Sequence, residues 1–493
     1  MDVNLSSKIT YIAQKQLQHT RRYQILIYVL IAVFDCFCSN AHMNTMVFVG
    51  YTPKHRCAVN TNDTRYYSKH YNKTYETNYD LDYKCSIIND NLKSSECKYG
   101  HVYDKTPIET SIVTEWNLIC KYNILPEVSQ ALFNFGIMSG AIMFGFLADR
   151  YGRKKIYVSC IIIQALIGAC ASFVQRYWEY IFLRMFVGAC EQGVNIIGFT
   201  LAIELFMEKE RAIFATSYSL FWSLGGVYFA LLAYLLRNWR VLQFFISIPW
   251  IFSIVLLWIL PESLIWLISK NRFKEADKIL IFATRLYPNY SLEKNYLSNF
   301  AEMEQNRAGP SSIENGKPDI KAKKSSNIYD LFKTPNMRKV SICVSLLWFF
   351  NMSTYFGWSY HTPNLNGNVY LNYFIHQVIE ALSFFMTMLL IIQYGRIKIL
   401  IIFQIIAGLS CIIGVFIPKY LFSYNMRWLQ LLFVIISKMG FSATAEIIYI
   451  YTPEIFPTCL RTTGKNTILM IRIIIVNNIV YTINAYLLTV IFA

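Results

Sequence analysis

Three of the charged side chains inside long apolar segments of this sequence are candidates for a binding site. They are Glu191 in segment 177–202, Glu380 in segment 369–392 and Arg472 in segment 467–492. A run of about 20 apolar residues can cross a membrane as a helix. Because charge is costly there, each such residue is a candidate for a solute or ion pathway. The alternatives are a structural pair between helices for Glu380, a pair within the first half of the chain for Glu191, and extension to the cytoplasmic interface for Arg472.

The first apolar segment, 23–49, also carries ionisable residues. Asp35 and His42 lie seven residues apart in it, which places them on the same side of a helix about two turns apart. This spacing predicts a local pair within that helix.

A short charged turn, 145–155, separates two further apolar runs, 131–147 and 156–173. It holds one acid and four bases, and short loops rich in Lys and Arg stay on the cytoplasmic side of a membrane. Acids and bases recur at the predicted cytoplasmic ends of both halves, where opposite charges could latch a gate. Static loop pairs contributing under ~1 kcal/mol are the alternative. The gate candidates are Asp149, Arg153, Glu204, Arg211, Glu454 and Arg461.

Composition excludes an ordinary soluble domain. Of the 493 residues, 55% are hydrophobic and only 15% are charged, and the mean hydropathy is +0.34. The net charge of +16 comes from bases in the N-terminal arm, short loops and one central segment. This distribution indicates orientation in a membrane rather than a nucleic-acid partner. No catalytic triad, metal cluster or Walker loop occurs, so we expect no enzyme, metal site, cofactor or ATP-driven pump.

One long polar loop, 50–125, holds four of the twelve cysteines: Cys57, Cys85, Cys97 and Cys120. Asn62 and Asn72 in the same loop open glycosylation sequons. An even cysteine count beside sequons predicts an oxidising, extracellular loop with two disulfides, and three pairings are open. Free thiols in an unmodified loop are the alternative.

The two halves of the chain repeat each other. Tyr-Gly-Arg closes the second apolar segment at 151–153 and the eighth at 394–396. An acid followed seven residues later by Arg recurs at 204–211 and 454–461. Because two motifs recur in the same order in both halves, we predict a duplicated six-helix unit. Eleven spans are recognisable, so the twelfth helix of a duplicated unit is missing from this sequence.

We therefore predict an all-α polytopic membrane protein that consists of two helical halves, the second of which lacks its last helix. Its predicted parts are a cytoplasmic N-terminal arm (1–22), an N-terminal half of six spans (23–260) that includes the large extracellular cysteine loop (50–125), a central cytoplasmic loop (261–337) and a C-terminal half of five spans (338–493).

Several motifs carry a resemblance to known transporters. The turn 145–155 resembles the loop between the second and third helices of the major facilitator superfamily. Segments 51–57 (YTPKHRC), 114–120 (TEWNLIC) and 261–267 (PESLIWL) resemble elements of the organic cation/carnitine transporter family within it. The resemblance implies the major facilitator fold of two six-helix halves and transport by alternating access.

The same resemblance suggests substrate-binding residues. Trp348 and Tyr355 match aromatic residues that line the family's cavity and could hold an ammonium group by cation–π contact. Glu380 matches a family acid that could meet a cationic substrate or a coupled proton. Gln192, beside Glu191, matches a position where cation carriers often have Lys. Arg472 lies where cation carriers tend to hold an acid and carriers of anions or carnitine hold a base.

The function these features predict is transport of small organic ions, whether organic cations, carnitine-like zwitterions or organic anions. A sugar or other solute carrier of the same superfamily is one alternative, and a decayed, non-transporting receptor or scaffold is another. The predicted partners are a small organic ion, a coupled cation or proton, and the lipid bilayer, with no nucleic acid. The predicted location is the plasma membrane, with the N-terminus in the cytoplasm.

Overall fold

The computed structural model describes most of the chain between residues 3 and 455. The described ranges are 3–58, 85–88, 94–97, 99–106, 108–285, 296–307, 334–361, 368–417, 420–421, 424–425 and 427–455.

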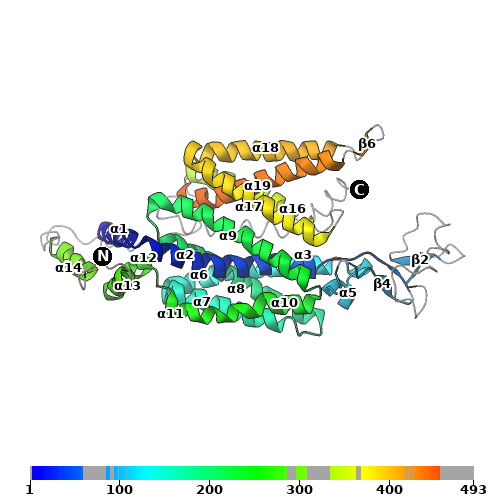
Figure 1. The fold of residues 1–493 in the computed structure, drawn as a ribbon, viewed down its shortest axis with the longest axis horizontal. Coiled ribbons are helices and arrows are strands. Elements are labelled where there is room, and N and C mark those ends of the chain that lie inside the picture. Colours follow the sequence, from blue (N-terminus) through cyan, green and yellow to red (C-terminus); the bar gives the residue numbers. More distant parts are fainter. Residues whose placement is uncertain are drawn as a thin grey trace.

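Long helices of the first half form one layer of the molecule (Figure 1). They are α2 (Arg21–Met43), continued by α3 (Met46–Val49), then α6 (Leu125–Tyr151), α7 (Arg153–Cys170), α8 (Tyr177–Glu204), α9 (Glu208–Leu235) and α10 (Trp239–Ser247), which runs on through η2 (Ile248–Val255) and α11 (Leu256–Ile259).

The described helices of the second half lie together against this layer (Figure 1). They are α16 (Pro335–His361), α17 (Val369–Tyr394), α18 (Arg396–Phe416) and α19 (Arg427–Ile455), with a small hairpin of β5 (Tyr420–Leu421) and β6 (Tyr424–Asn425) between the last two. Together the two layers cover ten of the predicted spans. The predicted eleventh span, 467–492, lies outside the described residues.

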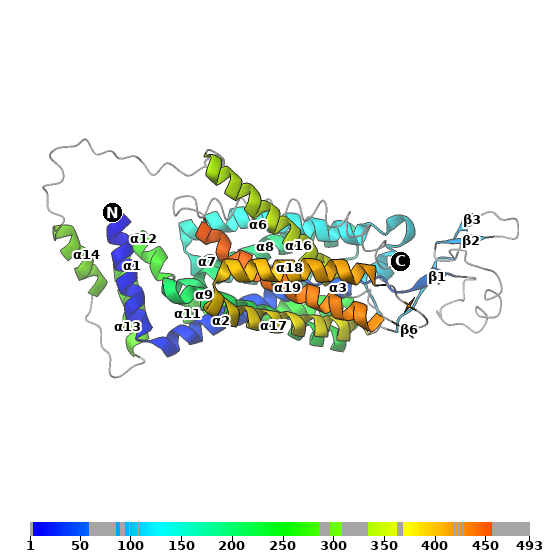
Figure 2. The same ribbon diagram turned by 90° about the horizontal axis from the view of Figure 1, so that it is seen from above.

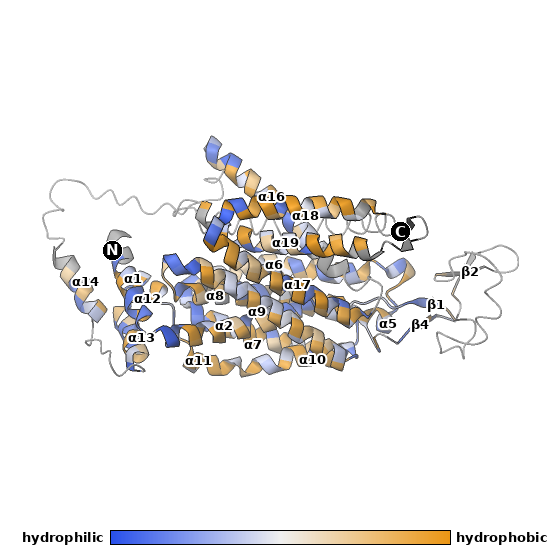
Figure 3. Cartoon of the chain, turned by 45° about the horizontal axis from the view of Figure 1, so that its top comes forward, coloured by the Kyte–Doolittle hydropathy of each residue, from blue (hydrophilic) through white to orange (hydrophobic). Residues whose placement is uncertain are grey.

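Eight segments of the described chain are long and apolar enough to cross a membrane. Helices α7, which opens with three bases, and α16, which carries several Ser, Asn and Thr residues, are not among these eight segments but pack in the same bundle. Hydrophobic residues predominate along the long helices, and hydrophilic residues are frequent in the segments at the two ends of the bundle (Figure 3). This is the distribution expected of a protein whose middle faces lipid.

Four short helices cluster at one end of the molecule: α1 (Val3–Gln18), α12 (Leu264–Ser269), α13 (Phe273–Arg285) and α14 (Tyr296–Arg307) (Figure 2). The predicted N-terminal arm is thus largely helical. Ile9, Ala13 and Leu17 recur every four residues on one face of α1 and are buried in the core, so α1 docks by an apolar stripe.

The opposite end carries a small cap built from the cysteine loop (Figure 2). Its strands form two antiparallel pairs, β1 (His55–Cys57) with β4 (His101–Tyr103) and β2 (Ser86–Ile88) with β3 (Ser94–Glu96). Helices α5 (Ile112–Trp116) and η1 (Cys120–Tyr122) lead from the cap into α6.

Glu115 of α5 ties the cap to the start of α10. It accepts hydrogen bonds from the Arg240 guanidinium, with Nη2 to Oε1 at 2.5 Å, and from Trp239 Nε1 at 2.6 Å. Arg240 also donates to the carbonyl oxygens of Ser172 and Val174. Charge-assisted bonds shared by three chain segments orient the cap relative to the helices.

Helices α6 and α8 pack with their backbones in close approach. A Cβ atom on Gly140 would lie 2.1 Å from the carbonyl oxygen of Ala189, and one on Gly188 would lie 2.2 Å from that of Phe133. Small residues at such crossings let transmembrane helices meet, because van der Waals packing replaces the hydrophobic effect inside lipid.

The repeated Tyr-Gly-Arg motif has the same geometry in both halves. Gly152, between α6 and α7, has φ +108°, and Gly395, between α17 and α18, has φ +80°. Only glycine adopts these values without strain. The duplication inferred from the motifs is therefore visible in the backbone.

The α6–α8 contact predicts a clear contrast between two glycines of one helix. Gly140→Ala is expected to lower stability by about 1–3 kcal/mol, because the added methyl group pushes the two backbones apart. A Cβ on Gly145 would meet no atom within 4 Å, so Gly145→Ala should leave stability unchanged or slightly raised. Thermal unfolding in detergent measures both, and equal shifts would contradict the assigned packing.

Candidate functional site

A cavity of about 170 Å³ lies between the two halves. Helices α2, α8 and α9 line it from the first half, and α16, α17 and α19 from the second. A polar cavity at the interface of two repeats is where transporters of this architecture bind solutes. Its polar and aromatic lining includes Glu191, Gln192, Tyr218, Trp222, Tyr355, Glu446 and Tyr449.

The described lining of the cavity contains two acidic residues. Glu191 on α8 and Glu446 on α19 are both buried and face the cavity from opposite halves. None of the described lining residues is Lys, Arg or His. Two carboxylates without a basic residue in the same lining make a site that attracts cations.

Glu380 lies just behind the cavity wall rather than in it. The hydroxyl group of Tyr355 donates a hydrogen bond to Glu380 Oε1, and Lys438 Nζ lies 3.9 Å from Oε2. The same ammonium group lies 3.9 Å from the centre of the Tyr355 ring. The pair between α17 and α19 thus supports the wall residue Tyr355, which corresponds to the structural interpretation left open by the sequence.

Trp348 also stands behind the wall. Its Nε1 donates to Thr452 Oγ1 at 2.8 Å, and its ring packs edge-on against Tyr449 at 6.2 Å. Trp348 therefore positions the lining residue Tyr449. Among the six predicted substrate-binding residues, the structure brings Glu191, Gln192 and Tyr355 to the cavity, places Trp348 and Glu380 behind it, and leaves Arg472 outside the described residues.

Two residues that the structure places at the cavity or behind its wall, Glu446 and Lys438, were not selected from the sequence. Both are ionisable residues within the tenth apolar segment, eight positions apart, and both are buried. The rule that selected Glu380, namely that intramembrane charge is costly and therefore informative, would have selected them too.

The predicted pair of Asp35 with His42 is wrong. Asp35 accepts hydrogen bonds from Ser39 and from Tyr218 of α9, while the carbonyl oxygen of His42 accepts one from Arg184. Seven residues along a helix correspond to about 10 Å, which is too far for a direct bond between these two side chains.

Two gate candidates of the first half, Arg153 and Glu204, belong to one polar network. Arg153 and Glu204 are ion-paired, and Ser263 Oγ also donates to Glu204. Glu262 Oε1 accepts from the backbone nitrogen atoms of Arg153 and Lys154 at 2.9 and 3.0 Å. A carboxylate in this position caps the start of α7.

Of the other gate candidates, two are involved in hydrogen bonds to backbone carbonyl groups, and two lie wholly or partly outside the described residues. Trp266 Nε1 donates to the carbonyl oxygen of Asp149 at 3.0 Å, and Arg211 Nε donates to that of Phe206 at 3.1 Å. Glu454 belongs to the last turn of α19, but its side chain lies outside the described residues, as does all of Arg461.

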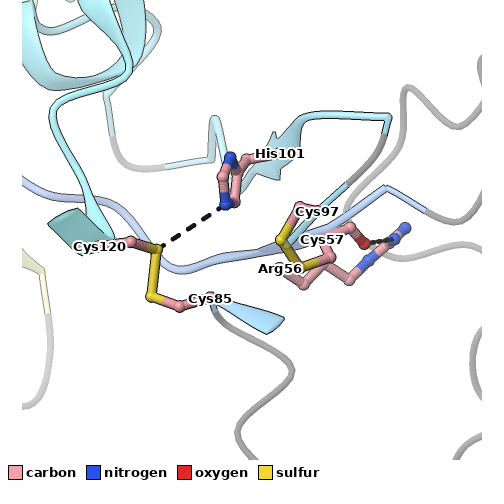
Figure 4. The surroundings of a disulfide bond; sticks show 6 residues. All are labelled: Arg56, Cys57, Cys85, Cys97, His101 and Cys120. Carbon is pink, nitrogen blue, oxygen red and sulfur yellow. Dashed lines mark hydrogen bonds between the residues drawn. A yellow bond between two sulfur atoms is a disulfide. The ribbon is translucent and has the colours of Figure 1, made fainter. Parts of the chain in front are cut away.

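The four loop cysteines form two disulfides, Cys57–Cys97 and Cys85–Cys120 (Figure 4). This is one of the three pairings the sequence left open. The first joins the β1–β4 pair to the β2–β3 pair, and the second joins that pair to η1. His101 lies between them, 3.8 Å from Cys120 Sγ (Figure 4); burial and the nearby His55 lower the pKa of its imidazole. The sequons at Asn62 and Asn72 lie outside the described residues.

The pair behind Tyr355 predicts a non-additive response. Glu380→Gln should cost about 3–5 kcal/mol of stability, because it leaves the Lys438 ammonium buried without this counter-charge. The double variant Glu380→Gln/Lys438→Met removes both charges and should recover most of the loss. Thermal unfolding of both single variants and the double variant measures the coupling, and losses that simply add would show that the pair is not formed.

Two helical halves around a buried cavity, with charged turns at one end and a disulfide-bonded cap at the other, define a membrane transporter of the major facilitator fold. Comparison with known proteins agrees. The family model described as "Sugar (and other) transporter" matches residues 56–491.

Individual relatives and solved structures are also similar to the chain. An organic cation transporter-like protein of Drosophila melanogaster is 31% identical over 457 residues, covering 89% of this chain and 78% of that protein. The organic cation/carnitine transporter 2 of Mus musculus is 30% identical over 76% of this chain and 64% of its own length. The xylose transporter XylE from E. coli, in a partially occluded inward open conformation, superposes with a TM-score of 0.58 at 15% identity over 94% of this chain and 91% of that chain.

The chain therefore belongs to the sugar (and other) transporter family, on its organic cation transporter branch. The resemblance inferred from the motifs and the all-α fold are confirmed. Because the family consists of transporters, the expectation of a transporter rather than an enzyme is confirmed as well.

Proposed function

We propose that this protein carries small organic ions across the plasma membrane by alternating access and that its cavity recognises a cationic group. The observation that carries the proposal is the lining of the cavity, to which the two halves contribute one acidic residue each, Glu191 and Glu446, together with aromatic rings. Carboxylates and ring faces are the groups that bind ammonium ions in proteins.

The names of the relatives support an organic ion rather than a sugar. They include organic cation transporters of Drosophila melanogaster and Caenorhabditis elegans, a carnitine transporter of Mus musculus and a beta-alanine transporter of Drosophila melanogaster. These solutes share an ammonium group, which is the part that the described cavity suits. A sugar carrier and a non-transporting receptor, the two alternatives, find no such support among them.

Arg472 suggests that the substrate also carries a negative charge. A zwitterion would satisfy both inferences, with its ammonium group at Glu446 and its carboxylate bound bidentately by Arg472. This assignment stays a prediction, because Arg472 lies outside the described residues.

Alternating access needs closure on each side of the cavity in turn. On the side of the cap, Phe48 of α3 stacks on Tyr370 of α17 at 5.4 Å and meets Tyr373 edge-on at 5.2 Å. Phe229 of α9 packs against the same Tyr373 at 5.9 Å. We assign this aromatic cluster as the outer closure, and the Arg153–Glu204 network as the first-half part of a cytoplasmic gate.

The orientation of the protein follows from the same two ends. The disulfide-bonded cap would lie outside the cell, where disulfides persist, and α1 with the basic turns would lie in the cytoplasm. These ends are opposite in the structure (Figure 2), which supports a cytoplasmic N-terminus.

Glu446→Gln tests recognition of the cation. Uptake of radiolabelled tetraethylammonium at low concentration should fall at least about tenfold, because a bond to a charged partner contributes about 1.5–3 kcal/mol. Glu179→Gln, which removes the same charge from an exposed position near the cap side of α8, should transport normally. Uptake by Glu446→Gln at the level of this control would contradict the assigned role.

Arg472→Asp tests the second charge. If Arg472 binds a carboxylate, the swap should shift preference away from labelled carnitine and towards a quaternary ammonium compound. Lys398→Asp, an equal charge change at an exposed position of α18, is the matched control. A wild type that moves only the cation, or a swap that leaves preference unchanged, would remove Arg472 from the site.

A further inference from the structure

Asp35 is a buried carboxylate that the proposed solute site does not use. It lies in α2, is 0% exposed, and is not among the residues that line the cavity. One of its oxygens accepts a hydrogen bond from Ser39 Oγ at 3.0 Å, and the other accepts one from the hydroxyl group of Tyr218 on α9.

The place for this carboxylate is built by neighbouring helices. On α8, a Cβ atom at Gly198 would lie 2.6 Å from Asp35 Oδ2 and 2.8 Å from the ring of Tyr157. Tyr157 of α7 in turn donates its hydroxyl hydrogen to the carbonyl oxygen of Ile31 at 3.2 Å. Any side chain larger than glycine at position 198 would therefore displace Asp35 or Tyr157.

Within the described part of the chain, no base neutralises this carboxylate. The titratable groups close enough to interact with its charge are Cys36 and Cys38 on its own helix, Tyr157 on α7 and Tyr218 on α9; Glu191 on α8 interacts with Cys38 as well. Among the described residues, no Lys, Arg or His forms an ion pair with Asp35. A carboxylate buried in a membrane without a fixed counter-charge is a site for a mobile cation.

Tyr218 connects Asp35 with the solute cavity and with the other half of the protein. Its side chain lines the cavity, as does Cys36. Its ring packs edge-on against Phe199 at 5.4 Å, and Phe199 packs edge-on against Tyr449 of α19 at 5.0 Å. A proton on Asp35 can thus reach the cavity through one hydroxyl group, and a shift of Tyr218 acts on the contact between the halves.

We propose that Asp35 is the proton-binding site of this carrier and that the protein exchanges one organic cation for one proton. The proposal rests on the proposed function, since it requires a cation in the cavity. A positive solute there stabilises the ionised form of Asp35 and drives its proton off through Tyr218. Linkage is reciprocal, so a proton on Asp35 weakens cation binding to the same degree. One positive charge enters as another leaves, and the cycle moves no net charge.

A proton is favoured over a metal cation by the groups that surround the site. Both carboxylate oxygens already accept bonds from hydroxyl donors, whereas a sodium ion would need those oxygens as ligands together with several more. The experiment must therefore distinguish coupling to a proton from coupling to a sodium ion.

The test uses the full-length protein reconstituted in liposomes loaded with a pH-sensitive dye, with radiolabelled tetraethylammonium as the probe. An interior one pH unit more acidic than the exterior should drive accumulation up to about tenfold above the external concentration, since one unit of pH corresponds to one decade in proton activity. Addition of the cation should make the interior more alkaline. Asp35→Asn should abolish both effects while tetraethylammonium counterflow at equal pH continues.

Glu210→Gln is the charge-matched control. It removes a carboxylate from the cytoplasmic surface pair with Arg21, and the response to the pH gradient should remain. Ser39→Ala keeps Asp35 but removes one donor to its ionised form, so the midpoint of the pH dependence of uptake should move to higher pH. This second variant decides the question if Asp35→Asn does not fold.

The failures are distinguishable. Counterflow without any response to the pH gradient in the wild type would overturn the exchange proposal and leave the proposed function intact. So would stimulation by an acidic exterior, by a sodium gradient alone, or by an acidic interior in Asp35→Asn, and so would an unmoved midpoint in Ser39→Ala. Absence of any movement of tetraethylammonium or carnitine would overturn the proposed function itself.

Discussion

A charge inside a membrane has to be compensated by a group in direct contact, and the interior of this carrier is arranged around that requirement. Glu380 is compensated by Lys438 at 3.9 Å and by the hydroxyl group of Tyr355. Asp35 accepts hydrogen bonds from two hydroxyl donors and forms no ion pair with a base of the described chain. Glu446 faces the cavity without an ion pair to any described base. The surroundings of the three carboxyl groups suit them to different roles: Glu380 connects two helices, Asp35 can bind a mobile proton, and Glu446 can bind a solute.

Movement between the two access states requires that each half remain rigid while the contact between them changes. The first half has the means for rigidity, since α6 and α8 meet backbone to backbone at Gly140 and Gly188. The turn between α6 and α7 is held by the Arg153–Glu204 pair and by Glu262 at the start of α7. By contrast, the contacts between the halves described above are largely aromatic.

The sequence predicted the elements of the site better than their arrangement. Glu191, Gln192 and Tyr355 were expected at the cavity and lie there. Glu380 was expected at the same place, but its contact with Lys438 keeps it behind the wall, and that contact joins residues 58 positions apart, which no local pattern reveals. The expected Asp35–His42 pair failed for a related reason, because a partner on α9 is nearer to Asp35 than any residue two turns along its own helix.

What the sequence determined by itself was everything that depends on short-range properties of the chain. Apolar length predicts the ten described spans, basic loops predict an orientation for them, and the repeated Tyr-Gly-Arg turns indicate the duplication, because each of these follows from the transfer of one segment into a membrane or from the backbone freedom of one glycine. Only the tertiary structure decided how the four loop cysteines pair, which carboxylates are neutralised and which remain available, and where the cavity lies. Those outcomes depend on groups far apart in the chain that come into contact only when the helices have packed, and hydropathy carries no information about which faces will meet.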